Sequence, residues 1–422
     1  MVSVKKIVKE RVLAYWWKCK KFVLDKRYET LRQALISQRK GGRKTIRALF
    51  LVRENQKWGA QTLYDAMALD ECFEPMIAVS VMNAEDSDIQ KGTRVSFWDN
   101  FDFFRSKGMR VVKAFDENEK KFIVLDKYSP DIVFYDQPYW IPPEHSLSSV
   151  SRYALTCYLP YGYGFYLAKR SGQLSSDFLP LIWRVFLESD NVLKGWDDRQ
   201  MSAGVNCVKI GYPKMDSLIS SMSDSNKNVS IARKNKRIIY APHHSLEKKH
   251  HNKYATFQWN GRWLLSYAKM HPDMDWVFKP HPRLKHALLE NELMTHDEVD
   301  GYYAEWESLS NAVVLDEGDY LEIFRDSDAL VTDCGSFLLE YYFTRRPIIQ
   351  LVNDASAGYG EFGEKVIEYY YKARDTKELE MLLSDVVIGG NDYLKSARLS
   401  TLDFPDDQAG ERIKEYLKNE LS

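Results

Sequence analysis

Histidine and lysine side chains that follow apolar segments are the strongest candidates for chemistry in this chain. Lys279 and His281 lie in the segment Lys279-Pro280-His281-Pro282, directly after the apolar run 276–278. The prolines on both sides of His281 fix the backbone, so the imidazole is aimed rather than mobile. A lysine and a histidine at the carboxyl end of a strand suit a phosphate ligand. The alternative interpretation is a polar turn with an incidental histidine.

A second pattern, typical of anion binding, is an apolar strand that runs into Asp333-Cys334-Gly335-Ser336 and then into an apolar helix. The N–H groups of Gly335, Ser336 and Phe337 would lie at the start of that helix, where the helix dipole favours an anion. Glu340, four residues after Ser336, lies on the same helix face and could accept a hydrogen bond from a ribose hydroxyl. In the alternative interpretation, Asp333 and Ser336 only cap the helix.

The adjacent histidines His243 and His244 follow a third apolar strand, 237–240. A histidine pair can bind a metal, but adjacent side chains point in different directions and no third ligand is spaced nearby. Because zinc needs at least three protein ligands, the sequence predicts no metal site here.

The elements that carry these motifs alternate between strands and helices, which indicates parallel sheets. In the first half of the chain we expect strands over residues 46–52 and 131–135 and a helix over residues 117–127. The length of 422 residues indicates two domains. We expect an α/β protein of the GT-B class, with two doubly wound, Rossmann-like domains that face a cleft. Residues 46–200 would form the acceptor domain and residues 201–396 the nucleotide-donor domain. Residues 397–422 would form a C-terminal helix that crosses back to the first domain.

The first 45 residues are strongly basic, with fourteen Lys or Arg residues against three acidic ones. Apolar residues recur at helical spacing over residues 4–40 and include Trp16 and Trp17. A basic amphipathic helix with aromatic residues is typical of an interfacial membrane anchor, so we expect residues 1–40 to contact an anionic membrane surface. The alternative is a helix packed on the protein body with a solvated basic face.

Composition limits the class of protein further. The formal net charge of −1 excludes a general nucleic-acid binder, and no segment is apolar enough to span a bilayer. The five cysteines are scattered, which fits reduced thiols, and no export signal is visible. These features predict a cytoplasmic protein that is peripheral on the inner face of a bacterial cell membrane.

Taken together, the motifs resemble those of the CDP-glycerol glycerophosphotransferases of teichoic acid and capsule synthesis. The resemblance rests on the order of five segments: Gly211-Tyr212-Pro213-Lys214-Met215-Asp216, Tyr240-Ala241-Pro242, Lys279-Pro280-His281-Pro282, Thr332-Asp333-Cys334-Gly335-Ser336 and Arg346-Pro347-Ile348-Ile349. It covers about residues 205–415 and implies transfer of a polyol phosphate from a CDP-linked donor to a lipid-linked or surface glycan, with release of CMP.

The resemblance also implies roles for individual residues. His281 and the turn from Asp333 to Ser336 would hold the pyrophosphate of the donor. Lys279, Phe337, Glu340, Gly211 and Pro213 complete the donor-binding residues that we expect. No cofactor is required, and the motifs leave the need for a divalent cation open.

The acceptor side departs from the family, whose Trp-His-Gly segment carries the proposed base. Tyr161 stands here where that histidine would be, within Tyr161-Gly162-Tyr163-Gly164. A tyrosine with its ordinary pKa near 10 is a poor base at neutral pH. Either His243, His244 or His145 takes this role, or the acceptor loses its proton late without a dedicated base. We expect Tyr161, Gly162, Tyr163 and His145 to line the acceptor groove, although the glycine-rich segment could be a simple turn.

Three other functions fit the same motifs. UDP-GlcNAc 2-epimerases also pair a His-Pro turn with an Asp-Ser-Gly-Gly turn, and a sugar-nucleotide glycosyltransferase of the GT-B class is a further alternative. The absence of a histidine on the acceptor side leaves room for a non-catalytic module that binds nucleotides and recruits partners.

Overall fold

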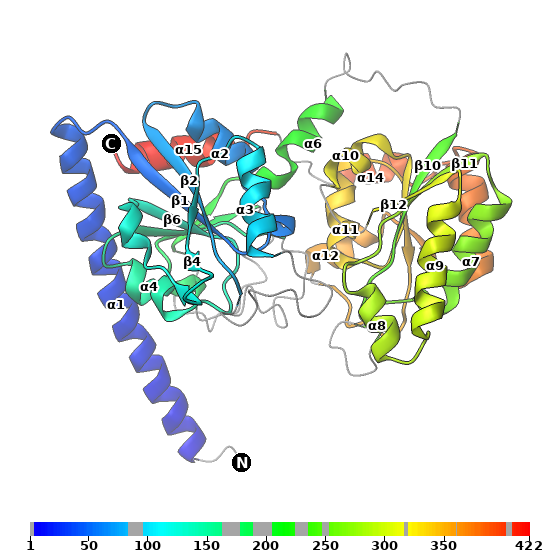
Figure 1. Ribbon diagram of the computed structural model, residues 1–422, viewed down its shortest axis with the longest axis horizontal. Coiled ribbons are helices and arrows are strands. Elements are labelled where there is room, and N and C mark those ends of the chain that lie inside the picture. Colours follow the sequence, from blue (N-terminus) through cyan, green and yellow to red (C-terminus); the bar gives the residue numbers. More distant parts are fainter. Residues whose placement is uncertain are drawn as a thin grey trace. The chain divides into compact units, whose positions relative to one another are not determined.

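The computed structural model describes residues 4–82, 96–162, 178–188, 205–223, 235–246, 253–315, 320–359, 361–401 and 407–422. It divides the chain into two compact units (Figure 1). Unit 1 comprises Met1–Gly164, Ala168–Lys214 and Gln408–Ser422, and unit 2 comprises Phe165–Leu167 and Met215–Asp407. The main boundary between the two units therefore follows residue 214. The sequence predicts a domain boundary after residue 200.

Unit 1 is built on a seven-stranded parallel sheet. In spatial order its strands are β3 (Val111–Lys113), β2 (Phe73–Val79), β1 (Ile46–Val52), β6 (Ile132–Tyr135), β7 (Leu155–Tyr158), β8 (Arg184–Leu187) and β9 (Cys207–Lys209). Its helices include α2 (Gln61–Ala68), α3 (Phe97–Ser106) and α4 (Leu147–Val150). The central strands consist mainly of buried apolar residues, as expected for a sheet that is covered on both faces.

Unit 2 repeats this architecture with six parallel strands. Their order is β12 (Ala312–Val314), β11 (Met274–Phe278), β10 (Lys236–Ala241), β13 (Ala329–Thr332), β14 (Ile348–Leu351) and β15 (Tyr371–Ala373). The helices are α6 (Pro213–Ser223, which begins in unit 1), α7 (Phe257–Met270), α8 (Leu284–Glu290), α9 (His296–Ser308), α10 (Leu321–Asp326), α11 (Gly335–Glu340), α12 (Glu361–Ile367), α13 (Thr376–Leu382) and α14 (Lys395–Thr401).

Both sheets reverse their strand order at the same point. The switch lies between the first and fourth strands of each unit, which are β1 and β6 in unit 1 and β10 and β13 in unit 2. In open parallel sheets, ligands bind beyond the carboxyl ends of the strands at this switch point. The loops after these four strands are therefore the places to look for function.

The prediction of a helix over residues 117–127 is wrong. A short hairpin of β4 (Phe115–Asp116) and β5 (Lys121–Phe122) takes its place, followed by a single 3₁₀ turn. The Asp116 carboxylate accepts the backbone N–H groups of Asn118 and Glu119, and Lys120 has a φ of +52°. Such local bonds from an aspartate compete with helix formation and close a turn instead.

The N-terminal helix α1 (Val4–Lys40) packs on unit 1 through its second half. Leu24, Tyr28 and Leu35 are buried. The Tyr28 hydroxyl donates to the Leu181 carbonyl oxygen at 3.1 Å and accepts from Thr156 at 2.7 Å. The second half of α1 is therefore packed on the protein body, as the alternative interpretation of this segment predicts.

The C-terminal helix α15 (Ala409–Glu420) belongs to unit 1 and lies beside α2 (Figure 1). Ile413 and Leu417 are buried in the core, and Lys418 pairs with Asp70 at 2.7 Å. The closing helix of the chain thus completes the N-terminal unit.

The contact between α15 and α2 gives a stability prediction. A Cβ atom at Gly410 would lie 2.6 Å from the backbone of Thr62 and of Leu63, where nothing flexible can yield. We expect Gly410→Ala to lower the free energy of unfolding by about 1–3 kcal/mol, measured by chemical denaturation. The control is Gly301→Ala inside α9, where a Cβ meets nothing within 4 Å. That change should raise stability by about 0.5–1 kcal/mol, and equal effects of the two substitutions would contradict the packing described here.

Candidate functional site

Three histidines meet at the carboxyl edge of the sheet in unit 2. His243 and His244 follow β10, and His281 follows the neighbouring strand β11. The ring centroid of His281 lies 5.2 Å from that of His243 and 4.0 Å from that of His244. Backbone bonds continue past the strand ends, because the His281 N–H donates to the Pro242 carbonyl oxygen at 3.0 Å. The loops after β10 and β11 are therefore held side by side.

The turn after β13 joins the same cluster through Asp333. Its Oδ1 accepts the backbone N–H of His243 at 2.6 Å, and its Oδ2 accepts the N–H and the hydroxyl of Thr256 at 2.6 and 2.7 Å. Thr256 directly precedes α7. Burial raises the pKa of Asp333 to about 6, although these three donors oppose the rise. At neutral pH the carboxylate is ionised, and its three bonds position the loop after β10 and the start of α7. The donor-binding role expected for Asp333 stays a prediction.

A serine that sequence reasoning missed fixes the tautomer of His243. The Ser245 hydroxyl oxygen accepts the N–H groups of Tyr254 and Ala255 at 2.9 and 3.1 Å, so its proton points to His243 Nδ1, 2.8 Å away. The Ser245 N–H also donates to this nitrogen, at 3.2 Å. Since His243 Nδ1 accepts both bonds, the proton of the neutral ring lies on Nε2.

His281 has the same tautomer for a similar reason. Its Nδ1 accepts the backbone N–H of Arg283 at 3.1 Å, within the turn that leads into α8. A backbone N–H cannot reverse its role, so the proton of the neutral ring again lies on Nε2. Both His243 and His281 thus present an N–H donor, which is the group that an anion requires.

This arrangement bears on metal binding. One ring nitrogen from each of His243, His244 and His281 lies within 4.8 Å of the others, so the third ligand that the sequence lacked is supplied by the fold. A metal, however, binds the lone pair of an unprotonated nitrogen. Binding through Nε2 of His243 or His281 would move the proton to Nδ1, where it would face a backbone N–H. The geometry therefore favours an anion over a metal.

The remaining residues of unit 2 expected at the donor occupy the same edge. Lys279 is buried at the end of β11, and Ser336 and Phe337 are partly exposed at the start of α11. Gly335 is buried behind them, and the Ser336 hydroxyl lies 3.4 Å from the Cys334 sulfur. Burial raises the pKa of the Cys334 thiol to about 11, so this cysteine is neutral.

Glu340 also lies on α11, but its carboxylate is buried against the Tyr320 hydroxyl. Its proposed bond to a ribose stays a prediction.

Two residues expected at the donor lie in unit 1 instead. Gly211 has a φ of +111°, and a Cβ there would meet Arg412 and Ala409 of α15 at 2.8 and 2.9 Å. The Pro213 carbonyl oxygen accepts the Thr62 hydroxyl at 3.1 Å. These contacts account for both residues by packing within unit 1, and their role at a donor remains a prediction.

His145 does not line an acceptor groove. Its side chain is completely buried, its Nε2 lies 3.0 Å from the Ile123 carbonyl oxygen, and its ring packs on Phe122. Burial lowers the pKa of His145 to about 4. The acceptor and base roles expected for this residue are therefore wrong, because the ring is a neutral part of the core.

Tyr161 and Gly162 lie at the carboxyl edge of the sheet in unit 1, after β7, while Tyr163 falls outside the described residues. The Tyr161 hydroxyl accepts from that of Tyr139 at 3.0 Å, and Lys57 Nζ lies 5.1 Å from the Tyr161 ring centroid. The Tyr161 carbonyl oxygen accepts the Tyr212 hydroxyl at 3.0 Å. Tyr161 is thus held among polar groups, as a groove for a hydroxylated ligand would require.

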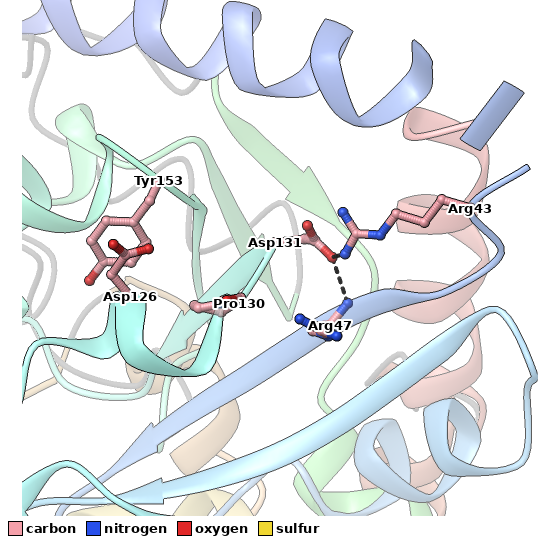
Figure 2. Close-up of a pocket in the computed structure, with 7 residues that line it drawn as sticks. Arg43, Arg47, Asp126, Pro130, Asp131 and Tyr153 are labelled. Carbon is pink, nitrogen blue, oxygen red and sulfur yellow. Dashed lines mark hydrogen bonds and ion pairs between the residues drawn. The ribbon is translucent and has the colours of Figure 1, made fainter. Parts of the chain in front are cut away.

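A polar pocket of about 340 Å³ lies at the opposite, amino-terminal edge of the same sheet. Figure 2 shows Arg43 and the backbone of Arg47 directed toward the Asp131 carboxylate. The Arg47 guanidinium pairs in turn with Glu74 at 3.2 Å. Because both arginines have acidic partners, this pocket ties the segment after α1 to the sheet and offers a ligand no unpaired arginine.

A family model described as CDP-Glycerol:Poly(glycerophosphate) glycerophosphotransferase matches residues 198–371. The chain resembles this family, as its motifs predict. The enzyme class inferred from the sequence, a glycerophosphotransferase-like phosphotransferase, is confirmed by the match. No curated protein sequence matches the chain.

Solved structures place this glycerophosphotransferase-like chain in the GT-B class. A variant of the wall teichoic acid polymerase TagF matches with a TM-score of 0.59 at 13% identity, covering 97% of this chain and 98% of TagF. The S. aureus MnaA–UDP complex matches with a TM-score of 0.57 at 14% identity and coverages of 90% and 97%. UDP-GlcNAc 2-epimerase from Neisseria meningitidis matches with a TM-score of 0.57 at 13% identity and coverages of 89% and 100%. At these identities the likeness shows the fold alone, and it confirms the predicted α/β fold class.

The three bonds of Asp333 give the second prediction. Asn in its place keeps one oxygen, so at least one of the three buried donors would face an NH₂ group. We expect Asp333→Asn to lower the free energy of unfolding of unit 2 by about 2 kcal/mol or more, because buried donors without partners are costly. Asp328→Asn at the other end of β13 is the matched control, since Asp328 is partly exposed and pairs with Lys236 at 3.4 Å. A loss below about 0.5 kcal/mol in Asp333→Asn, measured by urea unfolding, would contradict the positioning role.

Proposed function

We propose that this protein transfers glycerol phosphate, or another polyol phosphate, from a CDP-linked donor to a hydroxyl group of a lipid-linked or surface glycan and releases CMP. The supporting observation is the convergence of His243, His244 and His281 at the switch point of unit 2. The family match covers this region and favours a CDP-glycerol donor over the sugar nucleotides of the epimerases.

The chemistry of the cluster suits the leaving group of this reaction. Transfer of a phosphoryl group depends on positioning and on neutralising charge rather than on covalent catalysis. His243 and His281 each carry the proton of the neutral ring on Nε2, because Nδ1 accepts a backbone N–H, and Lys279 lies at the end of the adjoining strand. In the proposed complex these donors and the amides of Ser336 and Phe337 hold the diphosphate and stabilise the departing CMP.

Release of nucleotide from different donors tests the function. CDP-glycerol, CDP-ribitol and UDP-GlcNAc are each incubated with the protein, with and without a synthetic oligo(glycerol phosphate) acceptor. We expect CMP release that depends on the acceptor. His281→Ala should lower turnover about 100-fold or more, because a charge-stabilising donor is lost.

The matched control is His286→Ala on α8, an exposed histidine that pairs with Glu290 at 2.7 Å. It should leave turnover unchanged. Conversion of UDP-GlcNAc alone would favour the epimerase or glycosyltransferase alternatives. Normal turnover by folded His281→Ala would remove this residue from the mechanism.

The exposed part of α1 supports peripheral attachment to a membrane. Within the described residues, no helix is both long enough and apolar enough to cross a bilayer. Tyr15, Trp16 and Phe22 are nevertheless exposed by 72%, 52% and 60%, and Lys20 lies 5.0 Å from the Trp16 ring centroid. Aromatic residues interleaved with lysines suit the headgroup region of an anionic leaflet. A site on the inner face of the cell membrane, close to a lipid-linked acceptor, follows from the proposal.

Vesicle binding tests this attachment. Deleting residues 1–40 would also remove core side chains such as Leu24 and Tyr28, so point substitutions are the sharper test. Trp16→Ser combined with Phe22→Ser should weaken sedimentation with phosphatidylglycerol vesicles about tenfold or more, because each ring contributes roughly 1.5–3 kcal/mol on burial. Leu69→Ser, at another exposed apolar residue of unit 1, is the control. Equal binding by all three proteins would exclude α1 as the anchor.

A further inference from the structure

The switch point of unit 1 holds a carboxylate in the position that Asp333 has in unit 2. Asp136 follows β6 directly, as Asp333 follows β13. The preceding residues occupy equivalent places, because Tyr135 pairs with Leu51 of β1 and Thr332 pairs with Ala241 of β10. The two units therefore place an acid at the same point of the same strand order, where open sheets bind their ligands.

The two carboxylates differ in what they contact. Asp333 accepts three hydrogen bonds, two of them from Thr256 at the start of α7. The residue at the start of α2 is Ala60, which has no hydroxyl. The Oδ2 atom of Asp136 is buried, and among the described residues it has no hydrogen-bond partner. Asp136 and Ala60 line one small cavity of about 20 Å³. The carboxylate that is tied down in unit 2 is thus left with a spare acceptor in unit 1.

The charged groups around Asp136 are already engaged. The Arg53 guanidinium donates to the carbonyl oxygens of Tyr139 and Trp140, both at 2.8 Å. Lys57 pairs with Glu54 and lies 3.3 Å from the Gln137 side-chain oxygen.

Burial raises the pKa of Asp136 to about 6, while Arg53 and Lys57 oppose the rise and Glu54 adds to it. Tyr158 of β7 is near enough to feel the charge of this carboxylate, and burial raises the pKa of its hydroxyl, which stays neutral. Asp136 as a residue is partly exposed, although its Oδ2 atom is buried.

The residues around Asp136 include Tyr161, which stands where the related family has its proposed histidine base. Lys57 lies over the rings of both Tyr139 and Tyr161, with centroids 5.9 and 5.1 Å from its Nζ. The hydroxyl groups of these tyrosines bond to each other at 3.0 Å. Two tyrosine rings, a lysine and a carboxylate at the end of a parallel sheet form a surface suited to a polyol or sugar hydroxyl.

We propose that Asp136 is the general base that activates the acceptor hydroxyl, and that the Tyr139–Tyr161 pair flanks the bound acceptor. The inference rests on the proposed transferase function. The acceptor O–H bond breaks and its proton passes to the Asp136 carboxylate. The acceptor oxygen forms a bond to the phosphorus that carries the polyol, and the bond from that phosphorus to the CMP oxygen breaks. CMP leaves with the electron pair, and Asp136 later releases the proton to solvent.

Asp136→Asn tests the proposal, because it keeps the shape of the side chain and removes the base. We expect the rate of glycerol phosphate transfer from CDP-glycerol to the acceptor to fall about 100-fold or more. The Kd for CDP-glycerol should change less than about twofold. In the wild type the base works only when ionised, so the rate should rise with pH up to about 6 and then level off. This acid limb should be absent from Asp136→Asn.

Two further measurements separate a chemical role from a structural one. Burial raises the pKa of Asp136 in the folded state, so its negative charge destabilises the folded protein at a pH above this pKa. Asp136→Asn should therefore have a higher Tm than the wild type at pH 7.5 but not at pH 4. Ala60→Ser supplies the hydroxyl donor that Thr256 provides in unit 2. It should move the acid limb of the rate profile down by about half a unit or more.

The matched control is Asp131→Asn at the opposite end of β6, where the carboxylate pairs with Arg43. Its transfer rate should stay within about twofold of the wild type. If the wild type releases no CMP with any acceptor, the proposed function fails. If the wild type is active and Asp136→Asn retains both its rate and its acid limb, only the assignment of Asp136 is overturned. Should Asp136→Asn fail to fold, an unmoved acid limb in Ala60→Ser would overturn the assignment as well.

Discussion

The carboxylate of Asp333 is the interaction on which the site in unit 2 depends. It is buried, and its two oxygens accept bonds from the loop after β10 and from the start of α7. An ionised group in the interior is tolerated only when hydrogen bonds replace its lost hydration. Breaking any of these bonds would therefore cost free energy. The backbone of His243, which donates one of them, is held in one place for this reason. The position of the histidine cluster follows from a residue that need not touch the ligand.

The two units show how one topology supports opposite uses of the same residue type. Both place an aspartate after the fourth strand of the sheet, and burial raises the pKa of both to about 6. The difference is local: Thr256 directly precedes α7, whereas Ala60 directly precedes α2. Asp333 accepts two backbone N–H groups and the Thr256 hydroxyl, whereas Oδ2 of Asp136 has no hydrogen-bond partner among the described residues. In the proposed reaction, this difference in hydrogen bonding separates a structural carboxylate from a chemical one.

Much of this could be predicted from the sequence, because apolar runs that end in polar residues mark the carboxyl ends of parallel strands. Strand 46–52 was placed with its exact bounds, and Lys279, His281 and Ser336 lie at the edge that was expected. What sequence alone could not supply was the partner of each polar group. His145 lies two residues after Pro143, and its sequence does not reveal that the hairpin in place of the expected helix 117–127 packs on its ring. Asp136 also follows an expected strand, but only the strand order identifies that place as the switch point.

The positions of the ring protons, rather than the distances between the rings, determine which ligand the histidine cluster favours. Three imidazole nitrogens within 4.8 Å satisfy the spacing of a metal site. Two of the rings, however, each accept a backbone N–H at Nδ1. Because a peptide N–H cannot act as an acceptor, each of these rings must carry its proton on Nε2 whenever it is neutral. Protonation of either ring at Nδ1 would break that bond and place two N–H groups against each other. The backbone thus commits the cluster to donate hydrogen bonds, and a group with several negative oxygens is the ligand that such a cluster binds best.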